Sequence, residues 1–120
     1  MSTQQKILIN FQNGRNNLER ATISLVLAVT ASKTRETALF VSAEAAELCI
    51  TGVADDLVVP GYEPIKNLLE DYLANQGKIW LCPACAKAKG ISESDLVEGV
   101  EIAGAPKSMA FLDSGAQLLA

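Results

Sequence analysis

The sequence predicts a three-layer α/β/α domain with a mostly parallel sheet of about five strands. Apolar runs typical of strands alternate with segments of helical periodicity along the whole chain. The strand-like runs are nearly continuous in hydrophobicity, which favours a parallel sheet covered on both faces. The chain has 120 residues, of which 49% are hydrophobic. Because this is enough material for one core, we expect residues 1–120 to form a single domain.

The first strand and the first helix are separated by a polar turn. KILINF, residues 6–11, is β-prone and is expected to be the first strand. QNGRNN, residues 12–17, has the composition of a turn. Asn16 or Asn17 can cap the helix that follows, which we expect over residues 18–32.

The middle of the chain supplies a second strand, two helices and a long loop. TALFVS, residues 37–42, is expected to be the second strand, with a short helix over 43–48. Residues 51–63 contain two glycines and a proline and are expected to be irregular. Residues 64–75 are expected to form a helix, because Pro64 lies in its first turn and Gly77 just past its end.

The last third repeats the alternation of strand and helix. The expected elements are a strand over 78–81, a helix that starts at the CPAC segment and is closed by Gly90, a short helix from Ser92 or Ser94 to about Glu98, a strand over 100–103, a helix over 106–114 and a last strand over 117–120. In parallel sheets the reactive loops gather at the carboxyl ends of the strands. That edge is expected to bring together Asn13, Gly14, Arg15, Ser42, Glu44 and Cys82.

The CPAC segment concentrates the chemistry of this chain. Cys82 closes a strand and Pro83 opens a helix, so free N–H groups of the first helical turn are expected to point toward the Cys82 sulfur. Such an environment lowers the pKa of a thiol and increases its reactivity. Cys85 lies one helical turn later on the same face. We therefore predict Cys82 and Cys85 as catalytic residues, and Asn13, Gly14 and Arg15 as a weaker anion-binding candidate.

The cysteines also have a purely structural interpretation. Free cysteine is among the most buried residue types, so Cys82 and Cys85 can simply pack a helix against the sheet. This interpretation is preferred for Cys49, because nothing near it in the sequence would stabilise a thiolate.

The composition excludes several classes of site. The chain has no histidine, which removes Ser-His-Asp and Cys-His catalysis within it. Three cysteines without histidine fall short of the usual tetrahedral ligand set, so we expect no metal, and we expect no cofactor. The net charge of −4 and the absence of a basic cluster argue against nucleic acid.

The hydropathy pattern bears on location and assembly. The apolar stretch over residues 21–31 is too short for a membrane span, which needs about 20 residues. The first residues lack the pattern of a signal peptide, so we expect a cytoplasmic protein. The same stretch is apolar around most of the expected helix, more than one buried face requires, which predicts self-association.

The order and spacing of four segments resemble the DsrE/DsrF-like sulfur-relay family, which includes DsrE, TusD and YchN-like proteins. The segments are KILINF with its polar loop and apolar helix, GYEPIKNLLEDYLANQGKIWLC, CPACAKAKGI, and LVEGVEIAGAP with the helix and strand that follow. Together they cover nearly the whole chain. The resemblance implies a small flavodoxin-like or YchN-like domain that assembles as a homotrimer or homohexamer. It also implies a persulfide on the cysteine that ends the third strand, which Cys82 matches by its distance to Gly90.

From the resemblance we expect a sulfur-relay protein, of sulfurtransferase type if it is an enzyme. It would accept sulfane sulfur on Cys82 and pass it to a partner protein, with Cys85, an addition to the simplest family pattern, resolving or protecting the persulfide. Two alternatives remain open. One is a thiol–disulfide oxidoreductase using Cys82 and Cys85, although a thioredoxin fold normally has its CxxC nearer the N-terminus. The other is a non-catalytic oligomeric binding protein.

Overall fold

A single five-stranded sheet forms the centre of the molecule. The computed structural model describes residues 4–119, and its strands lie in the order β4-β3-β2-β1-β5, with every neighbouring pair parallel. The strands are β1 (Ile7–Phe11), β2 (Thr37–Val41), β3 (Lys78–Leu81), β4 (Val100–Ile102) and β5 (Gln117–Leu119). All five were expected within one or two residues, although the predicted end of the last strand at Ala120 lies outside the described residues.

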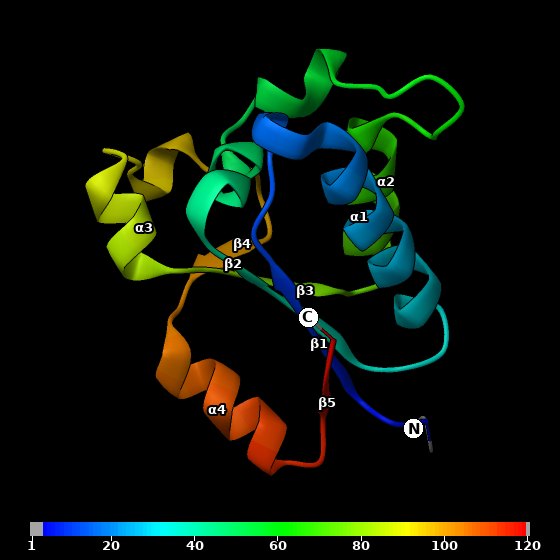
Figure 1. The fold of residues 1–120 in the computed structure, drawn as a ribbon. Coiled ribbons are helices and arrows are strands. Elements are labelled where there is room, and N and C mark those ends of the chain that lie inside the picture. Colours follow the sequence, from blue (N-terminus) through cyan, green and yellow to red (C-terminus); the bar gives the residue numbers. More distant parts are fainter. Residues whose placement is uncertain (1–3, 120) are drawn as a thin grey trace.

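Helices cover both faces of this sheet, which confirms the predicted fold class. Helices α1 (Leu18–Ser32) and α2 (Ile65–Ala74) lie on one face, and α4 (Ala105–Asp113) lies alone on the other (Figure 1). The short helix α3 (Pro83–Ala88) directly follows β3. Among the described helices, none combines the length and the hydrophobicity that crossing a membrane requires.

The alternation of side chains along β1 divides the core in two. Ile9 and Phe11 belong to the large cluster beneath α1 and α2, whereas Leu8 belongs to a small cluster beneath α4. Trp80 of β3 also belongs to the small cluster, where it packs edge-to-face against Phe111 of α4 with ring centroids 5.4 Å apart. The sheet therefore holds apolar side chains on both faces, as expected for parallel strands between helices.

Helix α1 begins as its sequence predicts. The side chain of Asn17 accepts a hydrogen bond from the Arg20 backbone N–H at 3.1 Å, which caps the helix. A 3-10 turn, η1 (Arg15–Asn17), joins it to the loop after β1.

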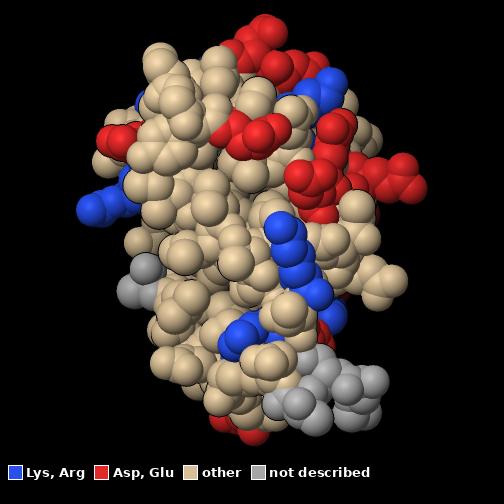
Figure 2. Space-filling view, turned by 90° about the vertical axis from the view of Figure 1, so that its right-hand side faces the viewer, with Lys and Arg blue, Asp and Glu red and all other residues tan. Residues whose placement is uncertain are grey.

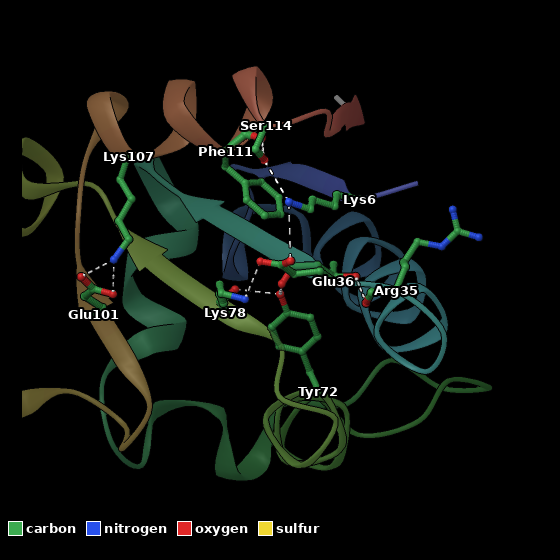
Figure 3. A network of polar contacts seen from close by, with 10 residues as sticks. Lys6, Arg35, Glu36, Tyr72, Lys78, Glu101, Lys107, Phe111 and Ser114 are labelled. Atoms are coloured by element: carbon green, nitrogen blue, oxygen red, sulfur yellow. Dashed lines mark hydrogen bonds and ion pairs between the residues drawn. The ribbon is translucent and has the colours of Figure 1, made fainter. Parts of the chain in front are cut away.

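Tyr72 fixes the end of α2 and explains the glycine that follows. The ring is fully buried, and its hydroxyl lies 3.1 Å from the Thr37 carbonyl oxygen and 2.7 Å from that of Lys78, so it bridges the starts of β2 and β3 (Figure 3). A Cβ on Gly77 would lie 2.3 Å from the ring. The left-handed residue at this helix end is Gln76, with φ +66, so Gly77 is needed for close packing and not for its backbone conformation.

An ion-pair network lies beside this tyrosine at the amino ends of the strands. Lys78 binds Glu36 at 2.9 Å, and Lys6 lies 3.8 Å from the same carboxylate (Figure 3). The hydrogen bond from Lys78 is the largest of the contributions that together lower the pKa of Glu36.

Two predicted helices differ from the structure. The helix expected up to Glu98 is only a 3-10 turn, η4 (Glu93–Asp95), with a capping box between Ser92 and Asp95. It ends because the next backbone segment bonds elsewhere: the Val97 N–H donates to the Cys49 carbonyl at 2.8 Å. The helix expected over 43–48 is also of the 3-10 type, η2 (Ala43–Cys49), and the loop over 51–63 contains a third such turn, η3 (Val53–Asp56).

Candidate functional site

Continued ladder bonds bring Cys82 to the carboxyl edge of the sheet. The Cys82 N–H donates to the Val41 carbonyl at 2.9 Å, and the Ser42 N–H donates to the Phe11 carbonyl at 3.0 Å. Each bond extends the parallel pairing one residue past the named strands. The loops that leave β1, β2 and β3 therefore start at one level of the sheet.

Cys82 is the N-cap residue of α3. Its carbonyl accepts the first helical bond from the Ala86 N–H at 3.0 Å, and Pro83 occupies the first helical position. The side chain is half-buried and the sulfur is a free thiol. Partial burial is the largest single influence on its pKa and acts to raise it. The Cys85 N–H, the Cys85 thiol and the Ala84 N–H together outweigh burial, so the pKa of Cys82 lies below its ordinary value.

Cys85 contacts the segment that follows β2. Its Sγ accepts a hydrogen bond from the backbone N–H of Ala43 at 3.3 Å. Ala43 has φ +52, a left-handed conformation that is uncommon for a residue with a Cβ. The structure therefore joins two segments, Ser42–Ala43 and Cys82–Cys85, which are about 40 residues apart in the sequence.

Packing and charge hold the segment after β2 in place. A Cβ on Gly14 would lie 2.3 Å from the Glu44 carbonyl oxygen, so the loop after β1 approaches η2 as closely as backbone can. The Glu44 carboxylate lies 4.0 Å from the Lys89 ammonium group of the segment after α3. On the other side of the cysteines, a Cβ on Gly104 would lie 3.1 Å from the Pro83 ring.

The weaker candidates lie in three different environments. Asn13 lines a groove beside α1, Gly14 is buried against η2, and the Arg15 guanidinium is bonded to the Glu47 carboxylate. An anion at Arg15 would have to compete with Glu47. The anion-binding role of the three residues stays a prediction.

Cys49 is buried, as expected. It is 5% exposed in the core under α2, and burial raises its pKa to about 12. Such a thiol is almost entirely protonated at neutral pH and therefore a poor nucleophile.

Ala43 is the residue of this site that sequence reasoning missed. Its contribution is a backbone N–H, which every residue except proline carries, so no residue type marks it. Residues 4–119 bring together no group of three or more cysteine and carboxylate side chains that could hold a metal.

Comparison with known proteins identifies the family. The sequence profile of the DsrE/DsrF-like family matches residues 5–120. The chain belongs to this family. Sulfur relay is a common role of DsrE-like proteins.

Relatives of this DsrE/DsrF-like protein include two from archaea. It is 33% identical over 100 residues to the uncharacterized protein MJ0760 of Methanocaldococcus jannaschii, an alignment that covers 82% of this chain and 36% of that protein. It is 36% identical over 86 residues to the uncharacterized protein MK0008 of Methanopyrus kandleri, covering 71% of this chain and 68% of that protein. The chain thus spans about a third of the length of the Methanocaldococcus protein.

Solved structures share the whole fold. The crystal structure of the YchN protein from E. coli superimposes with a TM-score of 0.80 at 27% identity, covering 97% of this chain and 98% of YchN. MTH1491 from Methanobacterium thermoautotrophicum, a protein of unknown function, gives a TM-score of 0.70 at 9% identity with the same coverages. At that identity the second likeness shows the fold alone.

Proposed function

We propose that this DsrE/DsrF-like protein is a sulfur carrier in which Cys82 accepts sulfane sulfur as a persulfide and donates it to a partner protein. The observation that carries the proposal is the position of Cys82, a half-buried free thiol at the N-cap of α3, where the pKa of the thiol is lowered. The thiolate is the nucleophilic form of cysteine. Membership in a family in which sulfur relay is common supports sulfur as the cargo.

The transfer needs no net oxidant or reductant. The Cys82 thiolate attacks the outer sulfur of a donor persulfide, a sulfur–sulfur bond forms on Cys82, and the donor leaves as its thiolate. In the second step an acceptor thiolate attacks the outer sulfur of the Cys82 persulfide, and Cys82 leaves as a thiolate. A leaving thiol of low pKa speeds this second step, so the lowered pKa of Cys82 assists both steps.

The assembly expected for this carrier is a homotrimer or homohexamer located in the cytoplasm. Support comes from the outer face of α1, where three large apolar side chains are exposed to solvent: Ile23 is 44% exposed, Val26 39% and Leu27 49%. Ile23 and Leu27 lie four residues apart on one helical face, so they form a continuous apolar strip. Such a strip is typical of a surface that another subunit covers.

A thiol–disulfide oxidoreductase is the second candidate. One observation favours it: Cys82 and Cys85 are both free thiols, at the N-cap and N3 positions of the first turn of α3. In this candidate function Cys85 attacks a mixed disulfide on Cys82 and releases the reduced substrate.

Intact mass after incubation with a persulfide donor tests the carrier. The wild type should gain about 32 Da per sulfur atom, Cys82→Ser should gain nothing, and Cys49→Ser should behave as the wild type because that thiol is buried. Cys85→Ser should keep or prolong the gain, since it removes the competing internal attack. Loss of dithiol exchange in both Cys82→Ser and Cys85→Ser, with no persulfide on any form, would favour the oxidoreductase instead.

A further inference from the structure

A groove lies at the amino ends of β2 and β3, beside the C-terminal ends of α1 and α2. Its volume is about 540 Å³. Three of its lining residues are cations, Lys33, Arg35 and Lys78, and one is a carboxylate, Glu36. We call it the basic groove. This local excess of positive charge occurs in a chain whose net charge is −4.

Two of the three cations have no acidic partner inside the molecule. Among residues 4–119, no carboxylate side chain forms an ion pair with Lys33 or Arg35. Uncharged groups hold the Arg35 guanidinium instead: it donates to the Gln5 carbonyl at 3.3 Å and to the Gln4 side-chain oxygen at 3.1 Å, and it points away from the Glu36 network (Figure 3). A guanidinium has five N–H donors, so donors remain for a carboxylate from outside.

The carboxylate of the basic groove is already neutralised. Glu36 pairs with Lys78 at 2.9 Å and lies 3.8 Å from the Lys6 ammonium group. The hydrogen bond from Lys78 is the largest cause of the lowered pKa of Glu36, and the positive charges of Lys78 and Lys6 add to it. Glu36 therefore leaves the positive charge of Lys33 and Arg35 uncompensated.

The floor of the basic groove is paired and its rim is open. The Asn75 side-chain N–H donates to Ser32 Oγ at 3.1 Å, and that hydroxyl donates to the Val29 carbonyl at 2.8 Å. These bonds tie the ends of α1 and α2 together without needing a ligand. Lys33 and Gln76 on the rim are exposed to solvent. An open groove with a cationic rim suits an extended acidic chain better than an enclosed small molecule.

We propose that the basic groove binds an acidic peptide segment of a partner protein, whose carboxylates pair with Lys33 and Arg35. At physiological ionic strength a charge acts over about 8 Å, so a short acidic segment responds mainly to these local cations. A long polyanion such as nucleic acid would also meet the net negative charge of the rest of the molecule. The basic groove and Cys82 lie at opposite ends of β3, so the proposal goes beyond sulfur transfer and does not depend on it.

The test is the fluorescence anisotropy of a labelled hexaglutamate peptide titrated with the protein. Lys33→Glu/Arg35→Glu should weaken binding roughly tenfold or more, because two attractive charges become repulsive. Lys66→Glu/Lys87→Glu is the matched control: it makes the same change in net charge at two exposed lysines beyond the carboxyl ends of the strands, and should weaken binding less than about twofold. Equal weakening by both double variants, or no saturable binding to the wild type, would overturn the proposal.

A second variant separates binding from folding, because Lys33 and Arg35 also lie just after α1, whose C-terminal end favours positive charge. Lys33→Gln/Arg35→Gln keeps long polar side chains and avoids the repulsion that two glutamates would introduce. It should keep the wild-type circular dichroism and weaken hexaglutamate binding roughly threefold to tenfold. Lower stability in urea with unchanged hexaglutamate binding would assign both cations to the helix end, and the proposal would be wrong.

Three further measurements distinguish other occupants and other sites. Tighter binding of a short single-stranded RNA than of hexaglutamate would make nucleic acid the occupant. A smaller mass of Lys33→Glu/Arg35→Glu than of wild type, in light scattering without peptide, would make a second copy of this chain the occupant. Hexaglutamate should leave the rate of Cys82 alkylation unchanged, and slower alkylation would place the peptide at Cys82. Each of these three results would overturn the proposal, whereas a wild type that gains no sulfur but binds hexaglutamate would contradict the sulfur carrier alone.

Discussion

At the residue scale, the pKa of Cys82 is lowered by hydrogen-bond donors and not by neighbouring charge. The groups that lower its pKa are the N–H groups of Ala84 and Cys85 and the Cys85 thiol. The ammonium group of Lys89, just after α3, lies 4.0 Å from the Glu44 carboxylate. The effect of a hydrogen-bond donor that a helical turn holds in place depends little on salt concentration. The effect of a surface charge is screened by dissolved ions. Thiolate formation at Cys82 should therefore depend only weakly on ionic strength.

Cys82 should be alkylated before Cys49 at neutral pH. The pKa of Cys82 is lowered, so its thiolate fraction rises at lower pH than that of an ordinary thiol. Burial raises the pKa of Cys49 to about 12 and also shields it from reagent. Peptide mass after brief exposure to iodoacetamide should show label on Cys82 alone. Equal label on the two residues would contradict the geometry described here.

Tyr72→Phe should lower the free energy of unfolding by about 1–3 kcal/mol, because one buried and one partly buried carbonyl group lose the hydroxyl that bridges them. Tyr62→Phe is the matched control. Its hydroxyl donates to Glu19 at the surface, and its removal should cost less than about 0.5 kcal/mol. Urea denaturation with an unchanged m-value measures both. A loss as small for Tyr72 as for Tyr62 would contradict the buried bridge.

At the element scale, hydrophobic runs and the positions of glycine and proline were enough to predict every strand and the three longer helices. Those features act over a few residues, which is the range that periodicity reports. The order of the strands in the sheet could not be predicted from the sequence, because it depends on which strands the long crossover connections place side by side. The prediction of a helix after Ser92 was wrong for a similar reason. The Val97 N–H donates to the Cys49 carbonyl, which is distant in the sequence, and no feature of the local sequence indicates that hydrogen bond.

In the candidate site, too, features visible in the local sequence could be predicted and features that depend on tertiary contacts could not. Cys82 and Cys85 were predictable, because their spacing and their place between strand and helix are visible in the sequence. Ala43 was not, because its contribution is a backbone N–H. Arg15 was a candidate for anion binding because of its position in a loop. Its bond to Glu47 of η2 could not be predicted, because that bond depends on a tertiary contact.

The close approach of the loop after β1 to η2 can be tested with Gly14→Ala. The new Cβ would lie 2.3 Å from the Glu44 carbonyl oxygen, so one of the two segments must move. We expect a loss of about 1–3 kcal/mol in the free energy of unfolding and slower Cys82 alkylation, because η2 begins with Ala43, which contacts Cys85 of α3.

Gly61→Ala is the control for this substitution. Gly61 has φ +89 and no atom within 4 Å of the position of a new Cβ, so only backbone strain of about 1 kcal/mol is expected. Cys82 alkylation should be unaffected. If Cys82 were alkylated at the wild-type rate in Gly14→Ala, the packing of the loop after β1 against η2 would have no influence on the site.

At the scale of the whole molecule, charge is unevenly distributed over the surface. The chain carries a net charge of −4. Figure 2 shows carboxylates gathered in the upper part of one face, Lys and Arg side chains below them, and an uncharged area at the left and centre of the view. An uncharged area offers little repulsion to a second molecule, so assembly through it avoids bringing like charges together.

The last prediction concerns self-association through α1. If the apolar strip of this helix is covered by another subunit, Leu27→Asp should place a charge in the interface and shift the protein toward monomer, while the monomer fold is kept because Leu27 is already 49% exposed. Light scattering at micromolar concentration should give a multiple of three of the 12.7 kDa chain mass for wild type and a smaller mass for Leu27→Asp. Val58→Asp, at an apolar side chain 50% exposed in the loop before α2, should keep the wild-type mass. A wild-type mass near 12.7 kDa would refute self-association, and equal dissociation by both substitutions would place the interface elsewhere than on α1.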